Sequence, residues 1–252
     1  MRPGTVLVAG RPPEPGEDPG RVLVFTTVRL LPGGPRWWSD HARRLSRDAE
    51  AFGLAAPPWA EVERHLADGS VPVRGLLVRI GLTARTWVLA ARPVPAPDRD
   101  PHRHGLPAIV TGHRVPTPLA RHKVGARAPW DAALREARRR GAWEALVMDE
   151  EGRLVDGSRT SPLLWAGKRL VVPEGGLPGI TRRHVIDRAR TLGIPVETRP
   201  VAPGELAGAE LLLAGTGVGL VPAAPPRSPE VRALLRAFRE FTPGAGEGSS
   251  GT

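Results

Sequence analysis

The sequence predicts a mixed α/β protein that is divided into two modest domains. The chain has 252 residues, which is enough for two domains of ordinary size. Hydrophobic residues account for 40% of it, so a packed core is within reach. Short runs rich in β-branched residues alternate along the chain with amphipathic stretches of helical period. This mixture favours helices packed against sheets.

Residues 1–112 are predicted to form the smaller, N-terminal α/β domain. The β-branched content of residues 21–31 predicts its longest strand. Ser39 is expected to cap a helix over residues 40–52. That helix would bury a stripe made of Ala42, Leu45, Ala49 and Phe52 and stop at Gly53. The remaining predicted elements are a strand at 5–9, a helix at 59–67, a hairpin of strands at 73–82 and 86–91, and a last strand at 109–110.

Residues 113–121 are predicted to be a connector, and residues 122–242 a larger, strand-rich C-terminal domain. Residues 243–252 are rich in Gly and Ser and are predicted to be a disordered tail. The predicted helices of this half are 129–140, 180–192 and 229–241. Its predicted strands are 146–148, 153–155, 163–165, 170–172, 196–201, 211–214 and 218–221.

The charge of the chain leaves a nucleic-acid-binding protein open as an alternative class. The formal net charge is +10, which favours phosphate groups as ligands. The Arg residues, however, are spread over the whole chain without a basic tail, an aromatic stacking motif or zinc-finger spacing. Phosphate binding in general is therefore favoured over binding to DNA or RNA.

The residue types that are missing exclude further classes. The chain has no Cys, which rules out disulfides, thiolate nucleophiles and Cys-ligated metal centres. No apolar run reaches the length of a membrane span and no signal-peptide pattern opens the sequence, so we expect a cytoplasmic protein. It also has no Asn and no Gln but 29 Pro, which fits a high-temperature organism; a GC-rich genome would look similar.

Lys123 is the residue around which the chemistry of this chain is organised. Of 36 basic Lys and Arg residues only Lys123 and Lys168 are lysines. An amine can lose its proton and form an imine with an aldehyde, whereas a guanidinium stays charged. Lys168 lies in a predicted turn and is expected to be an ordinary surface charge. Lys123 has neighbours that fit imine chemistry with pyridoxal phosphate.

Such a cofactor needs donors for its phosphate and a carboxylate that keeps its pyridine nitrogen protonated. Gly179-Ile180-Thr181-Arg182 opens a predicted helix, whose first amides and hydroxyl suit a phosphate. The turn Gly215-Thr216-Gly217 offers a second hydroxyl. Asp156, at the expected end of a strand, offers the carboxylate. Each of these signals is weak by itself.

Taken in order, the motifs resemble those of the class IV aminotransferases, the fold-type IV pyridoxal-phosphate enzymes. The resemblance covers roughly residues 22–226. Its motifs are Phe25-Thr26-Thr27-Val28-Arg29, His41-Ala42-Arg43-Arg44-Leu45, His122-Lys123 with Arg127, Glu144 to Ser158, Gly179 to Arg182, and Ala214-Gly215-Thr216. It implies a two-domain fold-type IV enzyme, with residues 122–242 as the cofactor-binding domain, and a homodimer.

The resemblance also implies roles for single residues. Lys123 would form the Schiff base with pyridoxal 5'-phosphate and shuttle protons. The phosphate would be held by Arg44, by the Ile180 and Thr181 backbone and by the Thr216 hydroxyl. Asp156 would face the pyridine nitrogen, at a position where the family usually has the longer Glu.

Within the family, Phe25-Thr26-Thr27 followed by Arg29 looks like 4-amino-4-deoxychorismate lyase, which makes 4-aminobenzoate and pyruvate for folate synthesis. Transaminating members commonly have Phe-Glu-Thr there. Thr26 would then relay a proton to the leaving group, and Arg29 and Arg127 would meet substrate carboxylates. A branched-chain or D-amino-acid aminotransferase on the same scaffold remains the alternative.

Overall fold

A computed structural model describes residues 1–69, 71–95 and 97–239, and the protein forms two compact units. The first contains Met1–Val94 and His122–Ala126, and the second contains Pro95–Arg121 and the chain from Arg127 onward. The chain therefore leaves the first unit after Val94, well before the expected connector at 113–121. It returns for five residues that include Lys123. The tail predicted at 243–252 lies outside the described residues.

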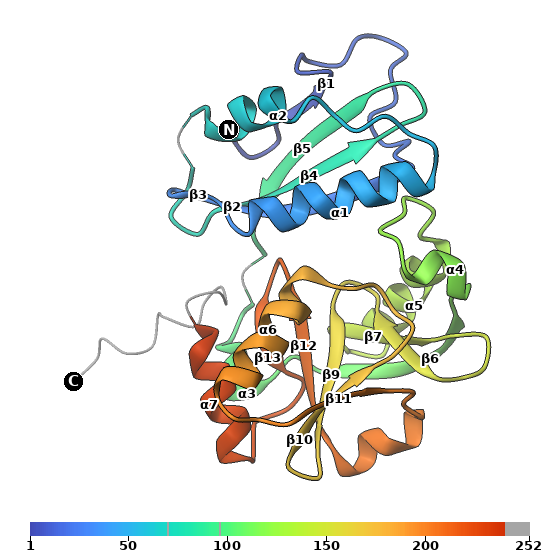
Figure 1. Ribbon diagram of the computed structural model, residues 1–252, viewed down its shortest axis with the longest axis vertical. Helices are drawn as coiled ribbons and strands as arrows, with labels where there is room; N and C mark the ends of the chain where they lie inside the picture. Colours follow the sequence, from blue (N-terminus) through green and yellow to red (C-terminus); the bar gives the residue numbers. More distant parts are fainter. Residues whose placement is uncertain (70, 96, 240–252) are drawn as a thin grey trace. The chain divides into compact units, whose positions relative to one another are not determined.

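The first unit is an antiparallel five-stranded sheet with strand order β1-β5-β4-β2-β3. Helix α1 packs along β2 on one face of this sheet (Figure 1). Strand β2 alternates between the two faces, so every second side chain turns toward α1. The elements are β1 (Val6–Val8), β2 (Val24–Leu31), β3 (Gly34–Pro35), α1 (Trp38–Ala51), α2 (Trp59–Ala67), β4 (Leu76–Leu82) and β5 (Trp87–Pro93).

Helix α1 differs from its prediction at both ends. It begins at Trp38, after Trp37 in a left-handed conformation with φ of 50°, so Ser39 lies inside the helix and does not cap it. Phe52, predicted to be buried, is 40% exposed. Phe52 is exposed because it follows the last helical residue as the C-cap, and the buried face of α1 carries polar side chains as well as apolar ones. Those buried residues are His41, Arg44, Leu45, Asp48 and Ala49.

The second unit contains two sheets. Strands β11-β10-β9-β12-β13 form one, and β6-β7-β8 form the other. Leucines and valines from both sheets build its main core, with Leu146, Leu164 and Leu213 almost fully buried. The strands are β6 (Ala108–Arg114), β7 (Glu144–Met148), β8 (Leu154–Gly157), β9 (Ser161–Ala166), β10 (Arg169–Pro173), β11 (Val196–Arg199), β12 (Glu210–Gly215) and β13 (Gly219–Pro222).

One strand belongs to a different unit from the one predicted. Residues 109–110 were expected to close the N-terminal domain. They lie in β6, which pairs in parallel with β7 in the second unit. Strand β6 also runs on to Arg114, into the stretch expected to be a connector. A parallel partner 36 residues further on leaves no local signal in the sequence, so β6 could not be assigned from its own residues.

Helices cover the sheets of the second unit. Helix α5 packs against β6 and β7 through Trp130, Ala133 and Ala137. Helix α6 packs against β12, but Leu192, predicted on its buried side, is 41% exposed beyond the helix end. In the described part of the chain, no helix is long and apolar enough to cross a membrane. The helices are α3 (Pro101–His104), α4 (Thr117–Ala120), α5 (Ala128–Arg139), α6 (Ile180–Thr191), the 3₁₀ helix η1 (Pro203–Gly208) and α7 (Pro229–Ala237).

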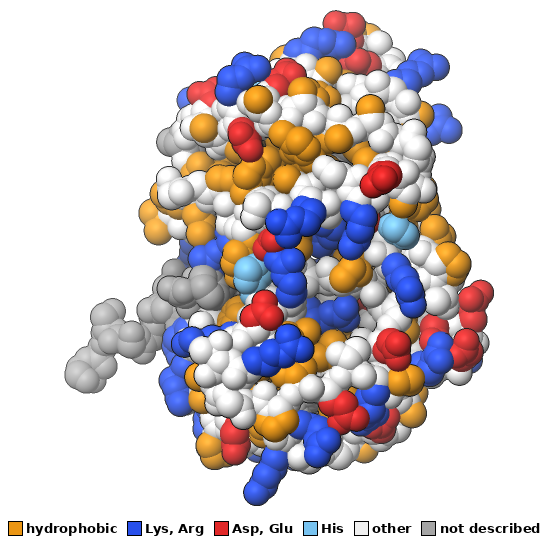
Figure 2. All heavy atoms as spheres, in the orientation of Figure 1, with side chains coloured by type: hydrophobic (Ala, Val, Ile, Leu, Met, Phe, Trp, Pro, Cys, Tyr) orange, Lys and Arg blue, Asp and Glu red, His pale blue; other side chains and the backbone are white. Residues whose placement is uncertain are grey.

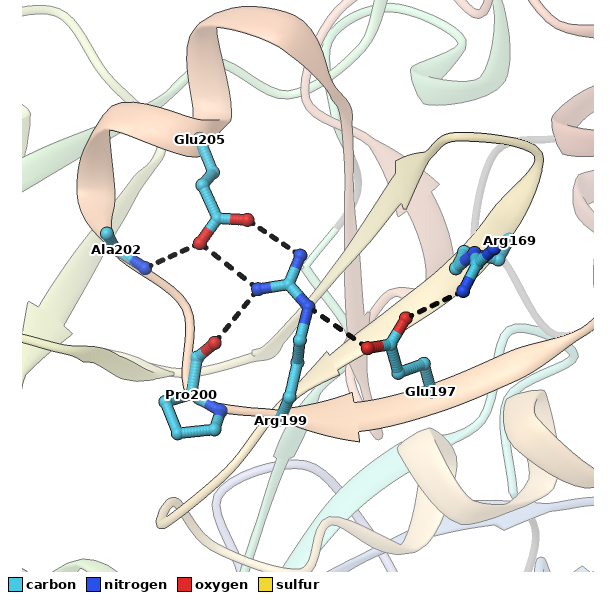
Figure 3. A network of polar contacts seen from close by, with 6 residues as sticks. All are labelled: Arg169, Glu197, Arg199, Pro200, Ala202 and Glu205. Carbon is cyan, nitrogen blue, oxygen red and sulfur yellow. Dashed lines mark hydrogen bonds and ion pairs between the residues drawn. The ribbon is translucent and has the colours of Figure 1, made fainter.

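An ion-pair network joins β10, β11 and η1 at the surface (Figure 3). Arg199 pairs with Glu205 at 2.7 Å and with Glu197 at 3.4 Å, and Glu197 also meets Arg169 at 3.1 Å. The hydrogen bond from Arg199 lowers the pKa of Glu205. Because water screens such exposed pairs, we expect each to contribute less than about 1 kcal/mol.

Candidate active site

The segment that carries Lys123 runs along the edge of β2. The N–H of Phe25 donates to the Lys123 carbonyl oxygen at 2.8 Å, and the N–H of Gly125 donates to the Leu23 carbonyl at 2.8 Å. Val124 bridges Val24 between these two bonds. The Lys123 amine lies 5.2 Å from the centroid of the Phe25 ring. Backbone pairing thus places the Lys123 amine beside β2, the strand that contains Phe25.

Only glycine fits at position 125. A Cβ atom there would lie 1.7 Å from the carbonyl oxygen of Val22, a backbone atom that cannot move aside cheaply. The missing side chain lets the Lys123 segment press directly against the start of β2. Gly125 is therefore part of what positions Lys123.

Thr26 and Arg44 lie together on the α1 side of the sheet. Arg44 donates to the Thr26 hydroxyl at 2.7 Å, and that hydroxyl lies 2.8 Å from Nδ1 of His41. Thr26 is 0% exposed. Burial lowers the pKa of Arg44 to about 10, opposed by the nearby Asp48 carboxylate. The Thr26 hydroxyl is thus engaged inside the unit by a buried cation and an imidazole.

The opposite face of β2 carries Phe25, whose ring lies beside the Lys123 amine. Phe25, Thr27 and Arg29 alternate with Thr26 and so point away from α1. Arg79 of β4 is paired directly with Thr27, and its guanidinium lies 3.9 Å from the Phe25 ring centroid. The hydroxyl on the Lys123 side is therefore that of Thr27. Thr26, the residue predicted to relay a proton, lies on the α1 face instead, because the order of residues does not show which face a strand residue takes; its role stays a prediction.

Arg29 lies deep in the same face. It is 6% exposed and donates to the Arg74 carbonyl oxygen at 3.3 Å. Burial, together with the charge of Arg36, lowers its pKa to about 10. A carboxylate ligand would stabilise a buried guanidinium such as that of Arg29, since an opposite charge offsets the loss of water around the cation. Arg29 therefore keeps the carboxylate-binding role that the sequence predicted for it, as a proposal.

A buried carboxylate near Lys123, that of Asp48, was not predicted from the sequence, and it contacts His122 of the predicted His122-Lys123 motif. Asp48 is 0% exposed, and its Oδ2 accepts the backbone N–H of Lys123 at 3.1 Å. Nδ1 of His122 lies 3.0 Å from Oδ1 of the same carboxylate. The available signal was that Asp48 follows Arg44 by one helical turn and so shares its face.

In the second unit, Asp156 lies inside β8 and is 7% exposed; it does not end the strand at a turn as predicted. Burial lowers the pKa of Arg182, and the Asp156 carboxylate opposes that shift. A Cβ at Gly176 would come within 3.5 Å of the Asp156 Cβ. The loop that precedes α6 therefore passes directly over Asp156.

The start of α6 has the features of an anion site. Gly179 is the N-cap residue, and no side chain of the described residues caps this end. Thr181 is 3% exposed, and its Oγ1 has no hydrogen-bond partner among the described residues. Arg182 and Arg183 follow in the first turn, where cations face the positive end of the helix dipole. A bound anion would remove that repulsion and satisfy the hydroxyl.

The remaining predicted cofactor residue of this unit lies close to the same end of α6. Thr216 is partly buried in the turn that joins β12 to β13. Ala214, two residues earlier, is paired with Ser161 of β9. A Cβ at Gly179 would come 2.7 Å from the Ser161 hydroxyl oxygen. Ser161 thus connects the start of α6 to the Thr216 turn within the unit.

Arg127 is held by contacts of its own. Its guanidinium donates to the Ser158 carbonyl oxygen and lies 3.7 Å from Asp131. It also lies 5.5 Å from the Trp130 ring centroid. These contacts give Arg127 a structural use in the second unit, and its predicted role toward a substrate carboxylate stays a proposal.

The predicted site residues thus fall into two groups by unit; within the first unit, Thr26 and Arg44 contact each other, whereas Lys123 lies beside Phe25 on the other face of β2. The first unit contains Lys123, Thr26, Arg29 and Arg44, and the second contains Arg127, Asp156, Ile180, Thr181 and Thr216.

Comparison with known proteins assigns the chain to a family. Residues 23–224 match the model of the family described as "Amino-transferase class IV". The chain belongs to the class IV aminotransferases. It is accordingly an enzyme of a pyridoxal-phosphate-dependent family, and its fold is that of the fold-type IV enzymes.

Named relatives include both lyases and aminotransferases. The "Crystal Structure of Putative 4-amino-4-deoxychorismate lyase" is 39% identical, with a TM-score of 0.83 over 97% of this chain and 99% of that one. The "Probable branched-chain-amino-acid aminotransferase" of Thermotoga maritima is 28% identical over 79% of this chain and 75% of its own length. A branched-chain aminotransferase from Thermoproteus uzoniensis, solved with norvaline, is 26% identical, with a TM-score of 0.79 over 96% and 95% of the two chains.

Proposed function

We propose that this protein is a pyridoxal-phosphate-dependent lyase that converts 4-amino-4-deoxychorismate to 4-aminobenzoate and pyruvate. The observation that carries the proposal is the pair of cations on the Phe25 face of β2, where Arg79 lies directly opposite Thr27 and Arg29 two residues along. This face suits an anionic substrate, and the buried Thr26 has a neutral hydroxyl at the position where transaminating members commonly have a carboxylate. The 39% identity to a structure named for this lyase supports the same choice.

Each unit, taken by itself, offers groups that suit the cofactor. In the first unit, Lys123 offers the amine and Arg44 a buried cation. In the second unit, the phosphate contacts are the N–H groups of Ile180 and Thr181 and the hydroxyls of Thr181 and Thr216. The buried Thr181 Oγ1, which has no partner among the described residues, fits such a ligand. Asp156 supplies the carboxylate for the pyridine nitrogen, and bound pyridoxal phosphate would act as the electron sink.

The substrate carries two carboxylates, which suits the cations of the Phe25 face. Arg29 and Arg79 can each bind a carboxylate through two parallel N–H donors. Because Arg29 is almost fully buried, its contribution would be larger than that of an exposed surface cation. These two residues would hold the ring with its amino-bearing carbon toward Lys123.

The net reaction is an elimination that needs no oxidant. The C–H bond at the amino-bearing carbon breaks, its electron pair enters the ring, and the neighbouring C–O bond breaks as the ring becomes aromatic. The Lys123 amine would take the proton from that carbon. The Thr27 hydroxyl would pass a proton to the departing enolpyruvate, which becomes pyruvate. Thr26 cannot take this role without giving up its contacts to Arg44 and His41.

The second candidate function is a branched-chain or D-amino-acid aminotransferase. The names of the relatives from Thermotoga maritima and Thermoproteus uzoniensis favour it. A homodimer and a cytoplasmic location belong to the proposal as well, on the strength of the family resemblance. Nucleic-acid binding is the least favoured alternative. On the face drawn in Figure 2, Lys and Arg side chains are interspersed with acidic ones and spread over the surface.

One experiment separates the two enzymes. Purified protein loaded with pyridoxal phosphate is given 4-amino-4-deoxychorismate, and pyruvate and 4-aminobenzoate are measured together. The lyase yields both in equal amounts. The same protein is then mixed with leucine or D-alanine while the cofactor absorbance is followed. Conversion to the pyridoxamine form with either amino acid, in the absence of pyruvate release from the first substrate, would instead establish the aminotransferase.

A further inference from the structure

One buried carboxylate ties the Lys123 segment to helix α1. Asp48 is fully buried. Its Oδ2 accepts the backbone N–H of Lys123 at 3.1 Å, and its Oδ1 lies 3.0 Å from Nδ1 of His122. A single side chain therefore holds both the lysine backbone and the residue before it.

This arrangement is specific to the folded chain. Asp48 is separated from His122 and Lys123 by 74 and 75 residues, so the contacts form only when α1 and the returning segment pack together. Arg47 is a third partner of this carboxylate and donates to its Oδ1 at 2.9 Å. A buried carboxylate needs such partners, because its removal from water costs several kcal/mol.

The His122 ring is itself fixed from a second direction. It packs edge-on against the Phe52 ring, with centroids 5.4 Å apart and planes at 90°. This contact gives a use to Phe52, which is otherwise partly exposed. With its ring clasped between Asp48 and Phe52, His122 limits the rotation of the backbone that leads into Lys123.

We propose that Asp48 and His122 are positioning residues that hold Lys123 in its reactive place. They act on the backbone, while the amine itself remains beside the Phe25 ring at 5.2 Å from the centroid. A fixed backbone reduces the freedom that the amine must lose when it reacts, which speeds the reaction without changing the amine. The inference rests on the proposed function, since it matters only if Lys123 is the reacting amine.

The test separates bond formation from binding. The Lys123 amine and the aldehyde of pyridoxal phosphate join with loss of one water, and borohydride then supplies the hydride that makes the link permanent. The rate at which pyridoxal phosphate is captured on the lysine is followed by peptide mass spectrometry, which distinguishes modification of Lys123 from modification of Lys168. Pyridoxamine 5'-phosphate, which has no aldehyde, measures binding alone.

The variants are Asp48→Asn, His122→Leu and His122→Asn, with Glu50→Gln on the exposed side of α1 as the matched control. We expect Asp48→Asn and His122→Leu to slow capture about tenfold, while affinity for pyridoxamine 5'-phosphate stays within about twofold. His122→Asn keeps an N–H donor for Asp48 and should restore most of the rate. Glu50→Gln should match the wild type.

Hydrogen exchange of the unloaded protein gives a second readout. In His122→Leu the amides of residues 121–126 should exchange faster, while those of β4 and β5 stay unchanged. Equal capture rates and equal exchange in all variants would overturn the inference. A wild-type protein that captures no pyridoxal phosphate on Lys123 would overturn the proposed function instead. In that case the hydrogen-exchange data still show whether Asp48 and His122 hold the Lys123 segment in place.

Discussion

The surroundings of Lys123 and the start of α6 prepare their polar groups in opposite ways. On the α1 side of the first unit, Thr26 contacts His41 and Arg44, and Asp48 contacts His122 and the Lys123 backbone. In the second unit the start of α6 presents a buried hydroxyl that has no partner among the described residues and a cationic first turn. The first arrangement suits holding an amine in place. The second suits receiving an anion from outside.

Polar groups with protein partners and polar groups without them should also differ in their effect on stability. A polar group that already has protein partners costs stability when it is removed, because the partners are left buried and unpaired. A polar group without partners costs stability while it stays. The predictions below test this contrast, from the largest expected effect to the smallest.

The largest effect is expected at Lys123. Lys123→Arg keeps the charge but cannot bond to an aldehyde, so borohydride capture of pyridoxal phosphate should disappear and turnover fall by about 10³-fold or more. The measurements are peptide mass spectrometry and pyruvate release. Lys168→Arg, the only other lysine variant possible, should retain both. Turnover that survives in Lys123→Arg would remove the amine from the chemistry.

Thr26 and Thr27 test the two faces of β2 against each other. Thr26→Val leaves Arg44 and His41 without the hydroxyl between them, so the free energy of unfolding should drop by about 1–3 kcal/mol. The Thr27 side chain itself is only partly buried, so Thr27→Val should change stability by less than about 0.5 kcal/mol. It should instead lower turnover by about a hundredfold, the scale of one lost proton transfer. Denaturant unfolding and pyruvate release measure the pair.

A reversed outcome, in which Thr26→Val is stable and inactive and Thr27→Val is unfolded or fully active, would restore the original choice of Thr26 as proton relay. That result would also mean that the side chains of β2 face differently from their strand alternation.

Removing the Thr181 hydroxyl should raise the stability of the protein without ligand and lower its affinity for phosphate. Thr181→Val replaces a buried hydroxyl with a methyl group, so the protein without ligand should gain up to about 1 kcal/mol of unfolding free energy. Affinity for inorganic phosphate or pyridoxamine 5'-phosphate should fall about tenfold, the loss of one good hydrogen bond. Calorimetry measures both quantities.

Thr191→Val is the control for this pair of measurements. Its hydroxyl bonds the Asp187 carbonyl oxygen at the exposed far end of α6. It should change neither property by much. If Thr181→Val destabilises the protein and leaves phosphate affinity unchanged, the hydroxyl has a structural partner and the start of α6 is no anion site.

The smallest effect is expected from His102, another buried group of the second unit. Burial lowers its pKa, with Asp100 opposing the shift and Arg239 reinforcing it. As the pH falls through the ordinary histidine range, the unfolded chain takes up a proton before the folded one does, so stability is lost on the acid side. His102→Phe should flatten that loss. Urea unfolding at several pH values measures it, with exposed His104→Phe as the control; parallel curves for all three proteins would contradict the prediction.

The sequence by itself determined the elements and the chemistry to look for. Period and β-branched content predicted the helix at 59–67 to the residue, and most strands to within a few residues, because these signals act between near neighbours. Lys123 was found because the chain has replaced lysine with arginine almost everywhere else. The order of the motifs then identified the family that the comparison confirmed.

Only the tertiary structure decided which side chains meet. A strand pattern does not tell which face looks toward a helix, so the choice between Thr26 and Thr27 needed α1 in place. The buried polar face of α1 was hidden for the same reason: Asp48 acquires its use from a segment 74 residues away. Local propensity fixes φ, ψ and period, whereas burial of a charge is stable only with partners that the fold brings from far along the chain.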